Sequence, residues 1–104
     1  MTKEEFKMLV MLYAANIDGK IDENEVDAIL SKADVTVFEK VKKQFKKMSD
    51  IDVLACINDN KEKYASSQED KQQLLNDIRE VIMADKCYSS IESQLLRVVN
   101  NILR

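Results

Sequence analysis

The chain contains no proline and only one glycine, Gly19, among its 104 residues. Glycine and proline punctuate most tight turns, and a β-sandwich or β-barrel would need many more of them. Their scarcity also leaves long stretches of chain without a helix breaker. Because a chain of this length forms one domain by default, the sequence predicts a single all-α domain over residues 1–104.

Apolar residues recur at helical spacing in six segments of the chain. The first four predicted helices cover about 3–16, 23–33, 35–48 and 50–64. The fifth begins at the signature Ser66–Glu69 and runs to about Ala84, and the sixth begins at Ser89–Glu92. The first should be buried on most of its circumference, because Met8–Ala15 is apolar throughout. The pattern predicts a compact bundle of about six helices.

Each predicted helix has an apolar side that should face the core. The inward faces of the first two helices extend to Ile17 and Ala33 at their ends. Gly19 should stop the first helix in a left-handed conformation. On the helix at 50–64 the candidates for burial are Ile51, Leu54, Ile57 and Tyr64.

Charge and composition exclude several classes of function. The formal net charge is −3, so a nucleic-acid partner is not expected. The absence of histidine excludes His-based acid–base catalysis and histidine metal sites. Cys56 and Cys87 are too few for a disulfide framework or a four-cysteine zinc site. No apolar run approaches the roughly 20 residues of a membrane span, so we expect a cytoplasmic protein without membrane insertion.

A basic block lies at residues 35–48. A single acidic residue, Glu39, stands against five lysines, which are Lys40, Lys42, Lys43, Lys46 and Lys47. They alternate around Val41 and Phe45 and should therefore coat the outer side of a helix. A solvated face is one interpretation, and a patch for an acidic partner is the other. The polar side carries no aromatic residues that would stack on bases.

Two similar acidic turns lie near the two ends of the chain. The first is Asn16-Ile17-Asp18-Gly19-Lys20-Ile21-Asp22 followed by Glu25, and the second is Met83-Ala84-Asp85 followed by Glu92. In each, an apolar helix ends at an aspartate and a glutamate follows seven residues later. Glu25 would hold the twelfth position of an EF-hand loop, but the first position would be Ala14, which has no side-chain oxygen. A complete EF-hand is therefore not predicted.

With these two motifs the chain resembles the tellurite-resistance TerB-like family. The resemblance implies a compact helical fold with pseudo-symmetric helical pairs, and a role in stress response or as an interaction module. It also implies an acidic surface cluster that holds a divalent metal. The candidate ligands in this chain are Asp18, Asp22, Glu25, Asp85 and Glu92. Oxygen ligands of this kind favour calcium or magnesium, bound weakly here because first-position ligands are missing.

Helix capping competes with metal binding as the role of these acids. Asp22 and Ser89 suit the N-cap position of the helices that they precede, with the glutamates three residues later as capping-box partners. Asp18 and Asp85 are not needed as caps in this register. Their positions in space therefore distinguish the two interpretations.

Three hypotheses for the function follow from these features. The leading one is a non-enzymatic helical module that binds a protein partner and, weakly, a divalent ion. A metal-dependent hydrolase could use paired carboxylates, but the sequence shows neither a nucleophile–base pair nor a phosphate-cradling loop. The third is a structural interaction domain without a ligand, whose contact surface is the Lys40–Lys47 face. The oligomeric state is left open.

Overall fold

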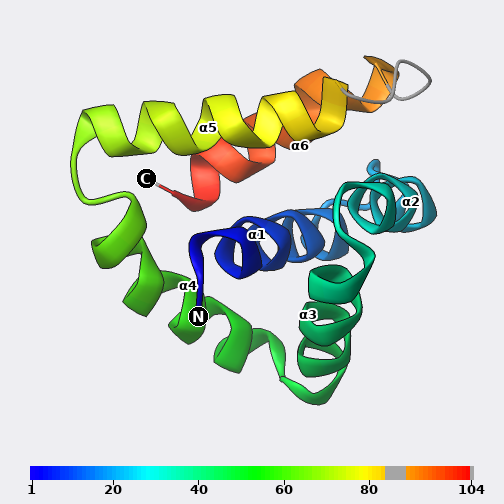
Figure 1. Ribbon diagram of the computed structural model, residues 1–104, viewed down its shortest axis with the longest axis horizontal. Coiled ribbons are helices and arrows are strands. Elements are labelled where there is room, and N and C mark those ends of the chain that lie inside the picture. The colour runs from blue at the N-terminus through cyan, green and yellow to red at the C-terminus, as the bar shows by residue number, and fades with distance from the viewer. Residues whose placement is uncertain (84–88, 104) are drawn as a thin grey trace.

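A computed structural model describes the chain at residues 1–83 and 89–103, with the side chains of 89–92 left out of the description. Within these residues the secondary structure consists of α-helices, and no strand is present (Figure 1). The helices are α1 (Lys3–Ile17), α2 (Glu23–Ala33), α3 (Val35–Lys47), α4 (Asp50–Tyr64), α5 (Gln68–Met83) and α6 (Ser89–Ile102). The predicted all-α bundle is confirmed, and its helix boundaries fall within one or two residues of those expected.

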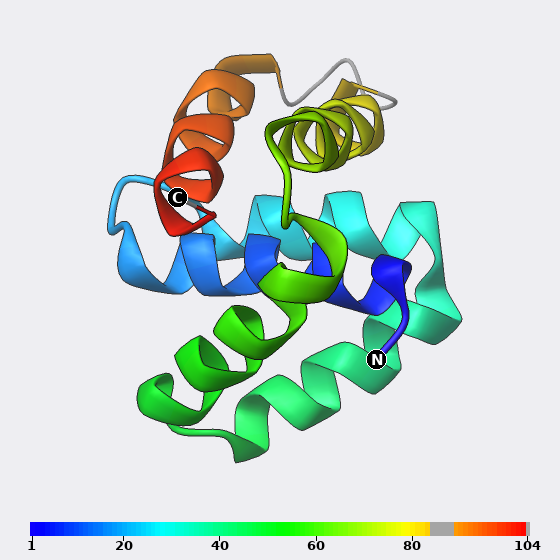
Figure 2. The same ribbon diagram turned by 90° about the vertical axis from the view of Figure 1, so that its left-hand side faces the viewer.

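Helix α1 occupies the middle of the molecule, and the other helices surround it (Figures 1 and 2). Every residue from Glu5 to Ala15 is buried, as the apolar run predicts. The helix packs against α2, α3, α4 and α6. Near its start, the Phe6 ring lies against the Tyr64 ring of α4, with 5.7 Å between centroids. The core is therefore organised around a helix that is apolar on nearly all sides.

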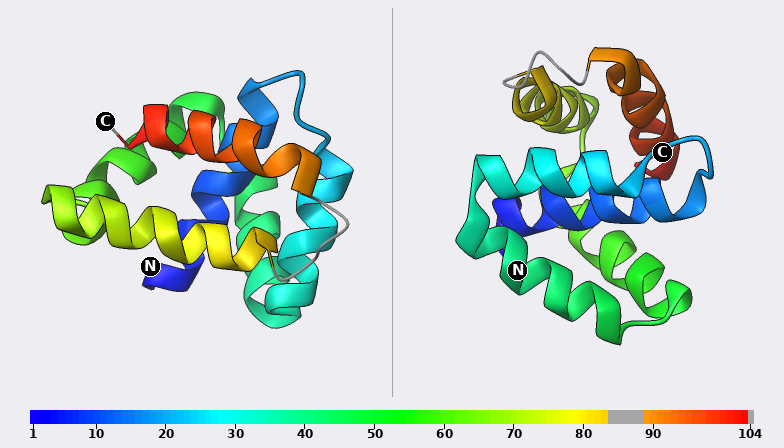
Figure 3. Two further views of the ribbon diagram at one scale, coloured as in Figure 1. Left: turned by 90° about the horizontal axis from the view of Figure 1, so that it is seen from above. Right: turned by 90° about the vertical axis from the view of Figure 1, so that its right-hand side faces the viewer.

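Helices that follow one another in sequence differ in how closely they pack together. Helices α1 and α2 pack together, and α5 runs beside α6 on one side of the molecule (Figure 3, left). Helices α3 and α4 diverge from their shared turn and both contact α1 (Figure 2). The Cα radius of gyration is 12.4 Å, close to the roughly 13 Å expected for a compact chain of about 100 residues. Within the described residues, no helix has the length and apolarity to cross a membrane.

Side-chain caps define the helix boundaries in a chain that lacks proline. Thr2 and Glu5 form a capping box at α1, and the bond from the Thr2 backbone N–H is the main cause that lowers the pKa of Glu5. Ser49 caps α4 in the same way with Asp52, and the Ser67 hydroxyl accepts from the backbone N–H of the third residue of α5 at 3.1 Å. Asp34 ends α2 and also caps α3, so one residue suffices to separate two helices.

Some predicted core positions lie instead on the surface. Ile51 is 80% exposed and Leu54 41% exposed, whereas Val53 of the same helix is 1% exposed. The inward face of α4 follows Val53 and Ile57, and at 100° per residue Ile51 and Leu54 point well away from it. Ile17 and Ala33 are also exposed, because each is the last residue of its helix. The prediction that these four side chains enter the core was wrong.

Candidate functional site

The acidic turn between α1 and α2 is held together by Asp18. Its backbone N–H donates to the Ala14 carbonyl at 3.2 Å, which ends α1. Its carboxylate Oδ1 accepts from the Lys20 backbone N–H at 2.9 Å, and its Oδ2 accepts from Gln94 Nε2 of α6 at 2.7 Å. Asp18 therefore closes the turn and joins it to a helix 76 residues further along the chain. Sequence reasoning assigned it no such structural role.

The surroundings of Asp18 stabilise its ionised form. The hydrogen bond from the Lys20 backbone lowers the pKa of Asp18 most, followed by the bond from Gln94 and the charges of Lys20 and Arg97. Arg97 Nη2 in turn donates to Gln94 Oε1 at 2.8 Å, which orients the amide toward Asp18. Gly19 has no positive φ, so the predicted left-handed conformation was wrong. The hydrogen bonds of Asp18, rather than a glycine, fix this turn.

The other candidate metal ligands have separate positions. Asp22 is the N-cap of α2, as predicted, and its Oδ1 accepts from the Asn24 backbone N–H at 2.9 Å. A capping box would also need the Glu25 carboxylate to accept from the Asp22 backbone N–H, and this bond is not found within the described residues. Asp85 and the side chain of Glu92 lie outside the described residues. The predicted meeting of the two acidic turns, and the capping role of Ser89, therefore stay predictions.

Among the described residues, the candidate metal ligands do not gather into one cluster. Across residues 1–83 and the described side chains of α6, no group of three His, Cys, Asp or Glu side chains gathers closely enough to hold an ion. Both Asp18 oxygens already accept hydrogen bonds, so a cation there would have to compete with Gln94 and the Lys20 backbone. Metal binding at Asp18, Asp22 and Glu25 remains a prediction that a titration can test.

An apolar groove lies directly beside this turn, between the end of α1, α4 and α6. It has a volume of about 480 Å³ and is lined by Tyr13, Ile17, Asp18, Gly19, Leu54, Val98, Asn101 and Ile102. We call these residues the α4 groove. Ile17 and Leu54 are 49% and 41% exposed, although both are large aliphatic side chains. Ile51, the most exposed of the large apolar residues described, lies one turn earlier on the same helix.

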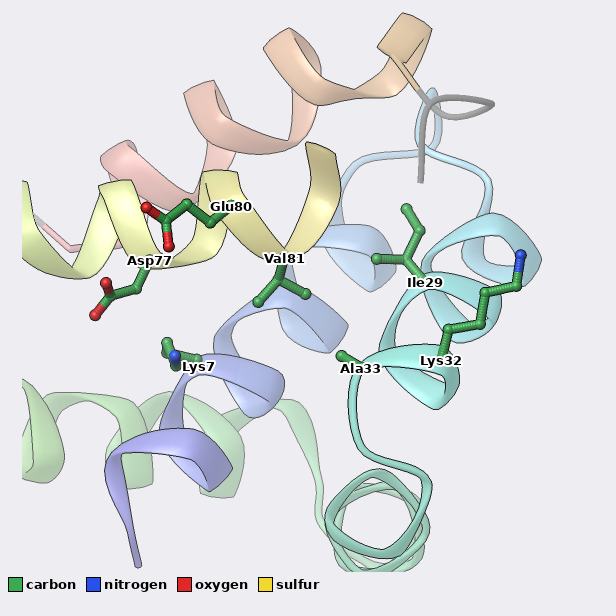
Figure 4. Close-up of a pocket in the computed structure, with 7 residues that line it drawn as sticks. All are labelled: Lys7, Ile29, Lys32, Ala33, Asp77, Glu80 and Val81. Carbon is green, nitrogen blue, oxygen red and sulfur yellow. The ribbon is translucent and has the colours of Figure 1, made fainter. Parts of the chain in front are cut away.

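A second cavity separates α2 from α5 (Figure 4). This α2–α5 cleft has a volume of about 590 Å³ and is lined by Lys7, Ile29, Lys32, Ala33, Asp77, Glu80 and Val81. Figure 4 shows Val81 facing the α2 side chains Ile29 and Ala33 across the middle, with charged groups toward the edges. The described lining contains no serine, threonine, cysteine or histidine, and thus no hydroxyl, thiol or imidazole nucleophile.

Two of the four charged residues that line the α2–α5 cleft, Lys7 and Asp77, form ion pairs with residues outside its lining. Lys3 Nζ lies 3.3 Å from Asp77 Oδ2, and Lys7 Nζ lies 2.8 Å from Glu4 Oε1. Burial is the strongest single influence on the pKa of Asp77, and it acts to raise that pKa. The hydrogen bonds from Gln73 and Lys3, with the charges of Lys3 and Lys7, outweigh it and lower the pKa of Asp77. A charged ligand would have to separate these pairs, so the cleft is a weaker candidate site than the α4 groove.

The α4 groove was missed by sequence reasoning because its two most exposed residues were expected in the core. The signal that could have found it is the presence of two apolar faces on α4. Val53 and Ile57 lie four residues apart on one face, whereas Leu54 and Ile51 lie about 80° and 140° from the middle of that face. An amphipathic helix needs one apolar face, so a second indicates another contact.

Comparisons with known proteins identify no relative: no family model matches the chain, and neither the curated proteins nor the solved structures give a match. Membership of the TerB-like family therefore remains a prediction from the two acidic turns. The function has to be argued from the surface that this chain itself presents.

Proposed function

We propose that this chain is a non-catalytic helical module that binds a protein partner through the α4 groove. The observation that carries the proposal is the exposure of Ile17 and Leu54 at the rim of one apolar hollow formed by three helices. Single exposed apolar side chains are common on protein surfaces. Several gathered around a concave surface are typical of interaction sites.

The energetics of the groove favour a compact apolar contact. Complete burial of an isoleucine or leucine side chain stabilises a structure by about 1.5–3 kcal/mol. Ile17 and Leu54 are each close to half exposed, so a partner that covers both gains roughly 0.6–1.5 kcal/mol from each. The lining comes from α1 and its following turn, from α6 and from Leu54 of α4, and an apolar surface shared by helices suits the apolar face of a partner helix.

The proposal agrees with the interaction role that the TerB-like resemblance implies. The TerB-like hypothesis also includes a role in stress response or tellurite resistance. It includes weak binding of a divalent cation at the acidic turn as well, and each of these needs its own test. The alternative of a metal-dependent hydrolase draws less support, because Asp77, one of the two carboxylates that line the larger cleft, is already paired with Lys3.

Selection from a displayed library of helical peptides on the folded protein tests this function. Selected peptides should bind Leu54→Glu at least tenfold more weakly than the wild type, a difference of about 1.4 kcal/mol. The matched control is Ala55→Glu, which places the same charge on α4 at an exposed residue outside the groove lining. The control should bind within twofold of the wild type. A selection that yields no Leu54-dependent ligand would refute the proposed function.

A further inference from the structure

The outer face of α3 concentrates positive charge in an acidic protein. The helix and its following residue carry five lysines and one acidic side chain, although the whole chain has a net charge of −3. Val41 is the one residue of α3 that is fully buried, and the helix lies at the edge of the molecule, beyond α1 (Figure 2). This face does not take part in the α4 groove, because no α3 residue lines it.

Two of the five lysines form ion pairs with carboxylates of neighbouring helices. Lys42 Nζ lies 3.2 and 3.1 Å from the two carboxylate oxygens of Asp27 on α2. Lys40 Nζ lies 3.2 Å from Glu5 Oε2 on α1. Both contacts are between neighbouring helices, so the lysines of α3 reach carboxylates presented by an adjacent helix.

The other three lysines have no such contact. Lys43, Lys46 and Lys47 are exposed, and no carboxylate of the described residues lies within ion-pair distance of them. Lys40, Lys43 and Lys47 are spaced at i, i+3 and i+7 and thus share one side of the helix, with Lys46 beside them. We call these four residues the lysine stripe. The side chain of Lys40 is 62% exposed despite its ion pair, so it remains accessible there.

Helix electrostatics explain only part of the lysine stripe. Lys46 and Lys47 lie in the last turn, where a positive charge favours the helix dipole. Lys43 lies outside that turn. Lys43 and Lys47 are also like charges at i, i+4, which repel each other on an isolated helix. A partner that brings carboxylates to this face would remove that repulsion.

We propose that the lysine stripe is a second contact surface, which binds an acidic helical segment of a partner protein. Acidic residues spaced at i, i+3 and i+7 on that segment would match the stripe in the way that α1 and α2 already match Lys40 and Lys42. A protein segment fits better than nucleic acid for two reasons. The rest of this chain is acidic and repels a long polyanion, and the polar side of α3 has no aromatic residue for base stacking.

A titration of the complete, isotope-labelled protein with defined peptides tests the inference. The probe is an 18-residue helical peptide with glutamates along one face, and its partner probe carries glutamine at each of those positions. We expect the glutamate peptide to shift the backbone amides of 40–47 with a submillimolar Kd at low salt, and to bind more weakly as salt rises. The glutamine peptide should leave them unmoved. Binding of both peptides alike would overturn the inference.

Matched charge reversals test the location of the contact. Lys43→Glu with Lys47→Glu should weaken binding of the glutamate peptide at least tenfold. Lys20→Glu with Lys63→Glu makes the same change in net charge at exposed residues elsewhere and should stay within twofold of the wild type. Circular dichroism and thermal melts establish that both variants fold. Equal weakening in the two variants would mean that net charge alone governs binding, and the stripe would be rejected.

The same titration separates the proposed partner from other anions and from self-association. Duplex DNA of matched charge and vesicles containing phosphatidylserine replace the peptide in two further arms. Tighter binding of either one than of the glutamate peptide would overturn the proposal of a protein partner. Amide shifts at 40–47 that depend only on the concentration of this protein would also overturn the proposal, because they would identify the partner as a second copy of the chain. The outcome is independent of the α4 groove, which Leu54→Glu tests separately.

Discussion

The two isoleucines of α4 give the sharpest test of the fold, because the sequence pattern treats them alike and the structure does not. Ile57 is fully buried, whereas Ile51 is 80% exposed. Both lie in the same helix. Replacing each in turn by alanine makes the same chemical change in the same helix, so the difference between the two variants reports burial.

The expected cost at Ile57 follows from the groups removed. Isoleucine to alanine deletes three carbon groups, each worth about 0.8 kcal/mol when buried, and the cavity left behind adds to the loss. We expect Ile57→Ala to lower the free energy of unfolding by about 3 kcal/mol, within the range of about 2–5 kcal/mol for such changes. For a domain of this size that corresponds to a fall in Tm of roughly 12–24 °C.

The expected cost at Ile51 is close to zero. A side chain that is 80% exposed loses only about 0.5 kcal/mol of transfer free energy on truncation. The higher helix propensity of alanine recovers a few tenths of a kcal/mol. Urea denaturation followed by far-UV circular dichroism measures both variants against the wild type. A loss above about 1 kcal/mol for Ile51→Ala, or below about 1 kcal/mol for Ile57→Ala, would show that α4 presents a different face to the core.

Three further predictions follow from the caps and the acidic groups. Ser49→Ala removes the N-cap of α4 and should cost about 1 kcal/mol, seen as a lower urea midpoint, and an unchanged midpoint would contradict the cap. The pKa values of Glu5 and Asp18 are lowered in the folded protein from ordinary values of 4.5 and 3.8. The stability that they contribute is therefore complete only above about pH 5, and it is lost as the pH falls through the folded-state values. Denaturation midpoints that rise on acidification to pH 3 would refute this. If the acidic turn binds calcium with a Kd on the order of 10⁻⁴ M or weaker, millimolar calcium should shift the amides of 18–25 and raise Tm slightly, and Asp18→Asn or Glu25→Gln should abolish both effects. Unmoved amides would leave these acids as caps and solvated surface.

The fold could be predicted because its signals are local. Asp22 and the signature Ser66–Glu69 mark helix starts through their side chains. The apolar run Met8–Ala15 identifies the buried helix without reference to anything else in the chain. The face of α4 could not be predicted in the same way. Its inner side includes Asn60, whose amide donates to the Cys56 carbonyl at 2.8 Å, and a polar residue at that position hides the true periodicity.

The site depends on contacts that local patterns do not contain. Asp18 was selected as a candidate metal ligand, and the structure shows instead a hydrogen bond to Gln94 in α6. No local pattern around either residue indicates this contact. The α4 groove likewise needs three helices to meet, so the exposure of Leu54 depends on how α4 is rotated against α1 and α6. Rotation of a helix about its axis is set by packing, and periodicity in one helix cannot determine it when two apolar faces compete.

The central position of α1 also constrains how the chain reaches its native state during synthesis. This helix is made before all of its partners, yet it is apolar on nearly every side and one of those partners is α6. Leu103, just beyond α6, is itself fully buried. A nascent chain therefore carries α1 with its α6-facing side uncovered until residues 89–103 have been made, and the core is incomplete before then. Premature termination anywhere before α6 should yield an aggregation-prone product rather than a smaller folded one, even though most of the helices would already be present.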